Sequence, residues 1–528
     1  MGFLAKGELE EQMNTGAIDL VETARNAGVE VCFANAGTTE VPIVMALDQV
    51  PGIRVVLGLF EGVCTGAADG WARMTGKPAA TLLHLGPGLA NGLANLHNAR
   101  RARTPVVNWI GQHTTGHQKF DPPLNSDITA LTGWVGWTRT IESTSEMAEA
   151  SYAAVEAALG LPGQVASLII PSNFQWEPGS SPIKKTPSPK RSEVSDSDLK
   201  NAASLLRTTE AGLLLGGNAL TERGLRAAAQ VSSTTGCNVW TETWPARQEC
   251  GRHVPAFPVL PYFPEQARAA FGNISSLVLS GATDPVAFFG YPNQPSRLAH
   301  DDVTRFMLSD PDHGSDATLA LEALVEELNA PLLTEPAREL TAFIPEGEPL
   351  NPVTLCQVIA ASIPENSILI NEAATTGFIW NAHASSAAPH TMLTITGGAI
   401  GQGLPNALGA SIACPGRRVI AFQADGCGMY TLQALWSMAR EGTDVTVVVC
   451  SNRRYHVIQL ELARAGSEKP GLKAHSLTDL THPIIDWSTL ARGFGLPAST
   501  VRTVDELTVA LNRSFAANGP SLIEVELP

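Results

Sequence analysis

Short apolar runs alternate with helix-length segments along the whole chain, and this alternation limits the fold more than any other feature of the sequence. Runs rich in Val, Ile and Leu are typical of strands that are buried on both faces of a parallel sheet. The predicted strands are residues 54–60, 79–85, 104–111, 164–170, 211–217, 237–243, 275–282, 367–372, 391–396, 417–425, 444–452 and 521–527. With helices such as 16–28 and 62–74 between the strands, the pattern predicts an α/β protein with mainly parallel sheets.

Two proline-rich stretches divide the chain. Residues 176–191 are rich in Pro, Ser and Lys, which is typical of an exposed linker, and residues 331–352 form a second boundary. A chain of 528 residues is long enough for about three domains. We therefore predict an N-terminal domain over 1–178, a central domain over 192–335 and a C-terminal domain over 350–528.

The charge of the chain excludes one class of partner. It has 35 basic and 51 acidic residues and a net charge of −16, so we expect no nucleic-acid partner. A small anion would have to be held by a local device, such as a metal ion or a helix N-terminus. The eight cysteines show no CxxC pair and no zinc-ligand spacing, so we expect reduced thiols in a cytoplasmic protein.

One segment needs to be weighed as a membrane span. Residues 373–416 contain no Asp, Glu, Lys or Arg and are long enough to cross a bilayer. They also contain His390, Pro405 and several glycines, which would leave unsatisfied backbone groups in lipid. Residues 1–14 lack the apolar centre of a signal peptide. We therefore predict no membrane segment.

Polar residues with metal-binding capacity end two successive strands near the C-terminus. Asp425 ends the predicted strand 417–425, and Asn452 ends the predicted strand 444–452. In a parallel sheet both lie at the carboxyl edge, where ligands of open α/β folds bind. Mg²⁺ suits a site made of a carboxylate oxygen and an amide oxygen, completed by a backbone carbonyl, water and phosphate. A helix is predicted to follow over 429–442, and a diphosphate bound at this edge would face its N-terminus. Taken alone, the dipeptide Asp425-Gly426 is more often a turn, and the dipeptide Ser451-Asn452 is more often an ordinary strand end.

The segment ADGCGMYTLQALWSMAREGTDVTVVVCSN, residues 424–452, resembles the diphosphate and Mg²⁺ signature of thiamine diphosphate (ThDP) enzymes. Ala424 and Ser451 depart from that signature, whereas Asp425 and Asn452 keep the metal-binding side chains. The resemblance implies three Rossmann-like domains: a pyrimidine-binding, a central and a diphosphate-binding domain, in that order.

The resemblance also implies a set of cofactor-binding residues in the C-terminal domain. The Mg²⁺ ligands would be Asp425, Asn452 and the backbone carbonyl of Arg454. The loop TGGAIGQGLPNALG is similar to the family's loop around the aminopyrimidine ring, which makes Gly398 a backbone acceptor and Ile400 the apolar residue that bends the cofactor. The other residues placed beside the cofactor are Gly426, Cys427 and Tyr455. Without the flanking match, Ile400 would be ordinary core.

A glutamate in the N-terminal domain completes the resemblance. Glu61 begins EGVCTGAADGWARMTGKP, which looks like the family's segment of a glutamate followed by a helix of small residues. A carboxylate beside N1′ of the aminopyrimidine promotes the imino tautomer, and this tautomer deprotonates C2 of the thiazolium. The cofactor itself therefore supplies the acidic carbon. Taken alone, Glu61 would be a glutamate favoured by the helix dipole.

The sequence is most similar to the branch that contains benzoylformate decarboxylase and acetolactate synthase. In that branch Thr38 would lie over the substrate carboxylate, and His84 would stand where benzoylformate decarboxylase has a catalytic histidine. Gln112 resembles the active-site glutamine of acetolactate synthases, with His113 beside it. A histidine at a strand end is, taken alone, more often structural.

The second histidine of benzoylformate decarboxylase has no counterpart, because Phe288 or Phe289 stands in its place. An apolar wall there would slow protonation of the enamine and favour its capture by an aldehyde or ketone acceptor. Tyr455 and Ile458 are further candidates for the pocket lining.

We therefore expect a ThDP- and Mg²⁺-dependent enzyme acting on a small 2-oxo acid, with decarboxylation and carboligation as its reactions. The alternatives are an acetolactate synthase, a lyase for 2-hydroxy ketones or 2-hydroxyacyl thioesters, and an inactive cofactor-binding regulatory paralogue. The family arrangement implies a homodimer or homotetramer with active sites between subunits. Some relatives hold a flavin in the central domain, but LGGNAL at 215–220 is too weak a glycine loop to support FAD.

Overall fold

The computed structural model describes residues 14–189, 192–333, 343–467 and 469–528, and all structural statements below refer to them. The chain divides after Pro189 into two compact units, which are described separately. The predicted boundary stretches 176–191 and 331–352 include residues 190–191 and 334–342, which lie outside the described part. Residues 1–13, on which the prediction of no signal peptide rests, also lie outside it.

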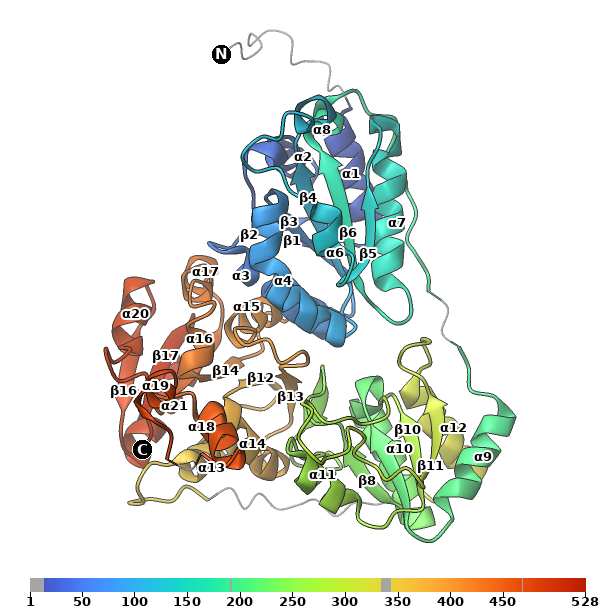
Figure 1. The fold of residues 1–528 in the computed structure, drawn as a ribbon, viewed down its shortest axis with the longest axis vertical. Coiled ribbons are helices and arrows are strands. Elements are labelled where there is room, and N and C mark those ends of the chain that lie inside the picture. The colour runs from blue at the N-terminus through green and yellow to red at the C-terminus, as the bar shows by residue number, and fades with distance from the viewer. Residues whose placement is uncertain (1–13, 190–191, 334–342, 468) are drawn as a thin grey trace. The chain divides into compact units, whose positions relative to one another are not determined.

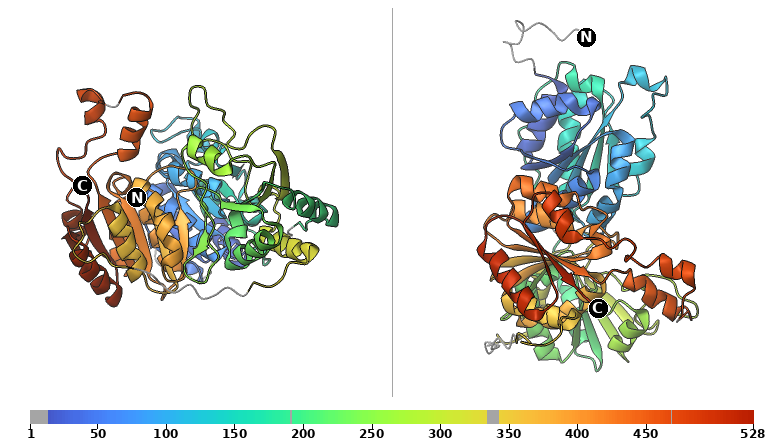
Figure 2. Two further views of the ribbon diagram at one scale, coloured as in Figure 1. Left: turned by 90° about the horizontal axis from the view of Figure 1, so that it is seen from below. Right: turned by 90° about the vertical axis from the view of Figure 1, so that its left-hand side faces the viewer.

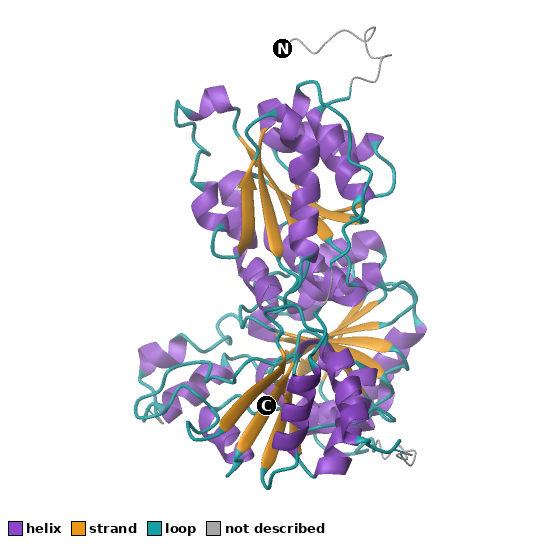
Figure 3. Cartoon of the chain, turned by 90° about the vertical axis from the view of Figure 1, so that its right-hand side faces the viewer, coloured by secondary structure: helices purple, strands orange, loops and turns teal. Residues whose placement is uncertain are grey.

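The first unit contains a six-stranded parallel sheet in the order β2-β1-β3-β4-β6-β5, with helices on both faces (Figures 1 and 3). The strands are β1 (Val31–Asn35), β2 (Arg54–Leu57), β3 (Ala79–Leu83), β4 (Val106–Gln112), β5 (Gly136–Thr140) and β6 (Val165–Pro171). The helices are α1 (Gly16–Asn26), η1 (Thr38–Glu40), α2 (Val41–Gln49), α3 (Glu61–Thr75), α4 (Leu85–Arg101), α5 (Thr115–Gln118), α6 (Ile128–Thr132), η2 (Thr144–Glu146), α7 (Met147–Leu159) and α8 (Ser172–Trp176).

Local chemistry explains where the elements of this unit begin and end. Strands β3, β4 and β6 are buried along their whole length, as their continuous apolar sequences predict. Helix α1 begins after Thr15, whose hydroxyl accepts a hydrogen bond from the backbone of Ile18, a cap typically worth ~1 kcal/mol. Helix α3 ends at Gly76, which has φ +69° and needs the left-handed conformation that glycine adopts without strain.

The second unit contains two sheets. One has four parallel strands in the order β11-β10-β7-β8, and the other has seven strands in the order β16-β17-β15-β14-β12-β13-β9. The first consists of β7 (Ala211–Leu215), β8 (Asn238–Thr241), β10 (Ser276–Ser280) and β11 (Thr304–Ser309). The second consists of β9 (Gln248–Cys250), β12 (Ser367–Glu372), β13 (His390–Thr394), β14 (Val419–Ala424), β15 (Val445–Ser451), β16 (Ala498–Val501) and β17 (Ser521–Glu526). With the sheet of the first unit, these sheets give the three Rossmann-like parts predicted.

Helices flank both sheets of the second unit. The strands β12 to β17 of the seven-stranded sheet, coloured orange to red, lie between helices of the same colours (Figure 2). The helices are α9 (Asp196–Leu206), η3 (Gly217–Leu220), α10 (Glu222–Thr235), α11 (Pro264–Phe271), α12 (Ala317–Leu328), α13 (Pro352–Ser362), α14 (Ala374–His383), η4 (Ala384–Ser386), α15 (Gly403–Ala413), α16 (Asp425–Gly428), α17 (Ala434–Glu441), α18 (His456–Arg464), α19 (Leu472–Ser476), α20 (Trp487–Gly493) and α21 (Val504–Ala516).

Strand β9 links the two sheets of the second unit. It lies within the residues predicted for the central domain, yet it pairs antiparallel with β13 of the C-terminal sheet, with Cys250 opposite His390. The hydroxyl of Thr391 also donates to the Glu249 carboxylate over 2.9 Å. This part of the central segment is therefore fixed to the sheet that carries the predicted metal residues.

The predicted linker at 176–191 is exposed over much of its described length but is held to α1 by hydrogen bonds. The backbone N–H of Ser180 donates to Asp19 over 2.6 Å, and that of Ile183 donates to the Thr23 hydroxyl over 2.9 Å. The described linker therefore forms a strap along the first unit.

None of the described helices combines the length and the hydropathy needed to cross a lipid bilayer. The uncharged segment 373–416 forms α14, β13 and α15 with their connecting loops. All eight cysteines are free of disulfides, and all except Cys414 are buried.

Candidate active site

Four of the predicted site residues lie at the carboxyl ends of neighbouring strands in the first unit. Thr38 begins η1 after β1, and Glu61 begins α3 after β2. His84 directly follows β3, and Gln112 ends β4. Since Asn35 pairs with Leu83 and Leu83 with Ile110, the parallel register brings these strand ends to one edge of the sheet. This is the edge at which open α/β sheets bind ligands.

The Glu61 carboxylate is buried, with 9% of the residue exposed. The side-chain amide of Asn91 on α4 donates to Oε2 over 2.9 Å, and no described residue donates to Oε1. Helix α4 passes so close that a Cβ atom on Gly88 would lie 2.9 Å from Oε1. Burial, and secondarily the charge of Glu61, raises the pKa of Cys64 to about 12. The site therefore offers a carboxylate with one oxygen free of donors, next to an inert thiol.

His84 contacts a second buried glutamate that sequence reasoning missed. Its Nδ1 lies 2.8 Å from Oε2 of Glu40, which is fully buried, whereas the His84 side chain is 25% exposed. Glu40 also accepts hydrogen bonds from the backbone of Gly37 and from the hydroxyl of Thr39. A carboxylate at Nδ1 favours the tautomer that carries its hydrogen there and leaves Nε2 toward a ligand. The signal in the sequence was the acidic residue three positions after Gly37.

Gln112 and His113 lie next to each other at the end of β4. Oε1 of Gln112 accepts a hydrogen bond from the His113 backbone over 2.8 Å, and Gln112 is 8% exposed. The ring of His113 packs against that of His117, with centroids 5.6 Å apart. Partial burial, then the neighbouring His117 and His84, lowers the pKa of His113. Thr38, in contrast, is exposed.

In the second unit, the structure brings Asp425 together with the segment after β15. β14 and β15 pair in register up to Ala424 and Cys450, so Asp425 and Asn452 follow adjacent strand ends. One carboxylate oxygen of Asp425 accepts the backbone N–H of Gly426 over 2.7 Å, and the other accepts that of Arg453 over 2.7 Å. Burial raises the pKa of Asp425, and these backbone donors oppose the rise.

Asn452 and Arg454 lie on the same turn. Oδ1 of Asn452 accepts the backbone N–H of Arg454 over 3.2 Å. No hydrogen bond to the backbone carbonyl of Arg454 comes from the described residues, so that oxygen is available as a ligand. Arg453 between them has φ +58°, a left-handed conformation that is uncommon for a residue with a side chain.

The helix predicted over 429–442 is wrong in its first half. Asp425–Gly428 forms the single turn α16, and a longer helix begins only at Ala434. The Thr431 hydroxyl donates to the carbonyl of Gly401 over 2.8 Å, which ties residues 430–431 to another loop. Gly426 has no room for a side chain, because a Cβ atom there would lie 2.5 Å from the ring of Tyr455. Cys427 beside it is 7% exposed, and burial raises the pKa of its thiol.

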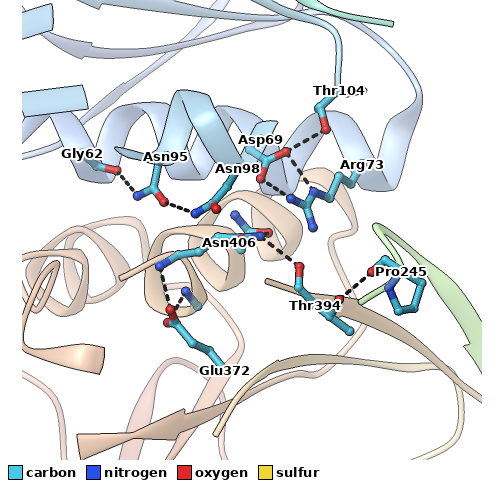
Figure 4. A network of polar contacts seen from close by, with 12 residues as sticks. Gly62, Asp69, Arg73, Asn95, Asn98, Thr104, Pro245, Glu372, Thr394 and Asn406 are labelled. Carbon is cyan, nitrogen blue, oxygen red and sulfur yellow. Dashed lines mark hydrogen bonds and ion pairs between the residues drawn. The ribbon is translucent and has the colours of Figure 1, made fainter. Parts of the chain in front are cut away.

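The loop that contains Gly398 and Ile400 is held by a glutamate that was not predicted. Glu372, which Figure 4 labels, lies buried at the end of β12. Its carboxylate accepts the backbone N–H groups of residues 401, 402 and 403 over 2.7, 3.1 and 2.6 Å. The side-chain amide of Gln423 donates to the same carboxylate over 2.9 Å. Burial raises the pKa of Glu372, and its four donors oppose the rise. Gly398, with φ +72°, is exposed, and Ile400 is partly buried.

Phe288 and Phe289 differ in their packing. Both lie in the long connection between β10 and β11. The ring of Phe288 packs against Trp244 with centroids 4.4 Å apart, whereas Phe289 is 60% exposed and makes no such ring contact among the described residues. Of the two, Phe288 is therefore the fixed apolar residue.

Two family models match the chain. The N-terminal TPP binding domain of thiamine pyrophosphate enzymes matches residues 14–133, and the C-terminal TPP binding domain matches residues 374–525. The chain belongs to the thiamine diphosphate enzyme family. This ThDP enzyme is 43% identical to IlvX of Mycobacterium tuberculosis, which is provisionally named an acetolactate synthase large subunit, over 97% of this chain and 99% of that protein.

Two further relatives act as points of comparison for this ThDP enzyme. It is 28% identical to benzoylformate decarboxylase of Pseudomonas aeruginosa, over 96% of this chain and 97% of that protein. The structure of the ThDP-dependent 4-hydroxybenzoylformate decarboxylase of Rhodococcus jostii superposes with a TM-score of 0.84 at 23% identity, over 97% of this chain and 99% of that one. The structural match supports the fold that the family implies.

The donor set of this ThDP enzyme fits Mg²⁺ rather than a transition metal. Within the described parts of the chain, no group of three or more His, Cys, Asp and Glu side chains is placed to hold a metal ion. Asp425, Asn452 and the Arg454 carbonyl instead provide oxygen atoms on one turn and the adjacent strand end. Mg²⁺ prefers oxygen ligands and keeps water and phosphate as its remaining partners, so these three residues suit a metal that bridges to a diphosphate.

Proposed function

We propose that this ThDP enzyme uses Mg²⁺ to decarboxylate a 2-oxo acid and passes part of the product to an aldehyde or ketone acceptor. The observation that supports this most is Glu61, a buried carboxylate at the carboxyl edge of the sheet whose Oε1 has no donor among the described residues. Bound ThDP supplies the nucleophilic carbon and the electron sink for decarboxylation.

Glu61 holds a proton at the aminopyrimidine nitrogen N1′ in this proposal. Asn91 orients the carboxylate through Oε2 and leaves Oε1 for the cofactor. In the second unit, the loop that Glu372 holds in place carries Gly398 and Ile400, which would line the part that binds the aminopyrimidine. The neighbouring Cys64 takes no part, because its pKa, raised to about 12, keeps it protonated.

Asp425, Asn452 and the Arg454 carbonyl would hold Mg²⁺, which would supply positive charge for the diphosphate. Gly426, Cys427 and Tyr455 line that site. The two backbone hydrogen bonds to Asp425 fix the direction of its carboxylate before a metal binds, which reduces the ordering required on binding.

His84 moves a proton at the substrate in the proposed reaction. The Glu40 carboxylate is hydrogen-bonded to Nδ1 of His84, so Nε2 is the ring nitrogen that donates or accepts the proton. Thr38 and Gln112, at the adjacent strand ends, orient the substrate carboxylate and carbonyl, and His113 is a second source of a proton.

Acetolactate synthase is the second candidate, and two observations favour it. Gln112 lies at the strand end where the resemblance expects the synthase glutamine, and Phe288 rather than a histidine packs at the central segment. An apolar residue there would supply no proton, which would favour reaction with an acceptor carbonyl over release of an aldehyde.

Reconstitution with ThDP and Mg²⁺, followed by CO₂ release from a panel of 2-oxo acids, tests the proposal. The panel includes pyruvate, 2-oxobutanoate and benzoylformate, each with and without excess acetaldehyde. The proposal predicts CO₂ release and, with the acceptor, a 2-hydroxy ketone. Tight ThDP binding without CO₂ release from any 2-oxo acid of the panel would contradict the proposal and indicate a cofactor-binding regulatory paralogue. A product of 2-acetolactate from pyruvate alone would assign the synthase.

The active form proposed is a homodimer or homotetramer with active sites shared between subunits. The first unit exposes a group of apolar side chains on α2, on the edge strand β2 and just after it, which an isolated protein would leave in water. The group consists of Val41, Val44, Met45, Val55 and Leu59, each at least 44% exposed. Sedimentation equilibrium that finds a stable and active monomer would reject the oligomer.

A further inference from the structure

Four aromatic rings form a cluster in the second unit, and of these the proposed function has used only Phe288. The aromatic cluster consists of Trp244, Tyr262, Phe288 and Phe378. The Trp244 ring lies 4.4 Å from Phe288 and 5.5 Å from Tyr262, centroid to centroid. The Tyr262 ring lies 5.1 Å from Phe288 and stacks on Phe378 at 5.6 Å. These separations are those of favourable aromatic pairs.

The structure fixes the aromatic cluster beside the proposed cofactor loop. Trp244 precedes Pro245, whose carbonyl accepts a hydrogen bond from the Thr394 hydroxyl over 2.7 Å at the end of β13 (Figure 4). Shortly beyond it, β9 pairs with the same strand. A Cβ atom built on Gly398 would lie 3.6 Å from the Trp244 ring. The cluster therefore borders the loop that carries Gly398 and Ile400.

The aromatic cluster is not ordinary core. A true core pair lies nearby in the central segment: the rings of Trp240 and Phe271 are 5.1 Å apart, and these residues are 6% and 3% exposed. In the aromatic cluster Phe288 is 42% exposed, and the other three members are partly buried. Ring surface left open in water is unfavourable, and such exposed rings are typical of a surface that a ligand covers.

The chemistry of the aromatic cluster limits what can cover it. None of its four members carries a charge, and the polar groups among them are the Tyr262 hydroxyl and the Trp244 indole N–H. Burial raises the pKa of Tyr262 to about 12, so the hydroxyl is neutral near pH 7. Flat apolar groups pack on such rings with dispersion and edge-to-face attraction, whereas a methyl group covers little of their area.

We propose that the aromatic cluster binds the side chain of the 2-oxo acid and that the preferred substrate carries an aryl group. The inference rests on the proposed function, because it assigns the substrate class of that same site. Trp244 and Phe288 are the specificity-determining residues. Trp244 lies beside Gly398 of the cofactor loop, and Phe288 has the most exposed ring of the cluster.

The test compares kcat/KM for benzoylformate and for pyruvate in the holoenzyme. Phe288→Leu and Trp244→Leu keep an apolar side chain but remove the ring. Each is expected to lower the benzoylformate to pyruvate ratio at least ~10-fold, mainly through a higher KM for benzoylformate, because aromatic pairing is lost. Trp436→Leu on α17 is the matched control, because its ring pairs with Arg440 outside the cluster, and it is expected to leave the ratio unchanged.

A binding measurement keeps this inference separate from the proposed reaction. Mandelate and lactate are the unreactive reduced forms of benzoylformate and pyruvate, and calorimetry gives their affinities without turnover. Tighter binding of mandelate that is lost in Phe288→Leu would support the inference even if no 2-oxo acid released CO₂. A preference for pyruvate and lactate, or a ratio that both ring variants leave unchanged, would overturn it while leaving the decarboxylase intact.

Discussion

The two units each place buried carboxylates at a sheet edge, but they use them differently. In the first unit, Glu61 receives one hydrogen bond, from a side-chain amide, and keeps one oxygen without a donor among the described residues. In the second unit, Glu372 receives four hydrogen bonds, three of them from consecutive backbone N–H groups. The exposed fractions, 9% and 4%, are similar, so burial alone does not distinguish these glutamates.

The difference teaches that hydrogen-bond saturation separates the two roles. A carboxylate with a free oxygen can exchange a proton with a ligand, whereas a saturated carboxylate holds backbone in place. Asp425 belongs with Glu372 in this respect, because both of its oxygens accept backbone N–H groups. We therefore expect the first unit to supply proton transfer and the second unit to supply binding.

The largest effect is expected at Asp425. Asp425→Ala should abolish ThDP binding in the presence of Mg²⁺, because the diphosphate loses its bridging cation and leaves uncompensated negative charge. Asn452→Ala should weaken binding less, since a neutral amide is the poorer ligand. Titration of each variant with ThDP at fixed Mg²⁺ measures both. An Asp425 variant with unchanged affinity would show that the metal site lies elsewhere.

Glu61→Gln should leave ThDP binding intact and reduce CO₂ release at least ~100-fold, the range for a positioned acid–base group. The amide is isosteric with the carboxylate and can keep a hydrogen bond with Asn91, so the fold is expected to be retained. Steady-state turnover at saturating ThDP measures the effect. A variant within a few-fold of wild type would remove the distinction between the two units.

His84→Ala should lower turnover ~10- to 100-fold while leaving ThDP affinity unchanged, because the ring moves a proton at the substrate and not at the cofactor. Glu40→Gln should produce part of the same loss, since it removes the acceptor that fixes Nδ1. The two losses should not add in the double variant, because Glu40 acts through His84. Full additivity of the losses would assign Glu40 an independent role.

Glu372→Gln should lower stability and ThDP affinity without slowing the chemistry of bound cofactor. The amide places an N–H donor against backbone donors, which destabilises a buried site by about 1–3 kcal/mol. Urea unfolding and ThDP titration measure these effects, with Glu61→Gln as the matched glutamate control. A large loss of turnover at saturating ThDP would mean that Glu372 also moves protons.

The smallest effect concerns His390, which begins β13 in the sheet that carries Glu372. Burial lowers the pKa of His390 to about 4, while its Nδ1 bonds the Ala388 carbonyl. As pH falls below about 6.5, the unfolded chain binds a proton that the folded protein does not, so stability declines until pH reaches about 4. His390→Asn should therefore reduce the stability lost between pH 7 and 5 by up to about 2 kcal/mol. An identical pH dependence in wild type and variant would contradict the shifted pKa.

Much of the architecture could be predicted because it depends on local pattern. Each of the strands predicted from continuous apolar runs is present, and Glu61 and Asp425 lie at strand ends as expected. Strands such as β5 and β9 were missed because they are short, polar or at sheet edges, where burial leaves no clear pattern in the sequence. The first half of the helix predicted over 429–442 is absent, because a tertiary contact from Thr431 to Gly401 competes with helix formation there.

The site was predicted less completely, for a physical reason. Motif spacing identifies residues on one strand end, but Glu40 and Glu372 act through partners far away in the sequence. Trp244 was missed in the same way, since its neighbours come from the connection that carries Phe288 and from the Gly398 loop.

Exchange of the C2 proton of bound ThDP with deuterium tests the central claim most directly, because it reports cofactor activation before any substrate binds. Rates are measured by NMR after rapid acid quenching at saturating ThDP and Mg²⁺ in wild type, Glu61→Gln and Glu372→Gln. The account predicts exchange at least ~100-fold slower in Glu61→Gln and close to wild type in Glu372→Gln. Exchange in Glu61→Gln as fast as in wild type would contradict it.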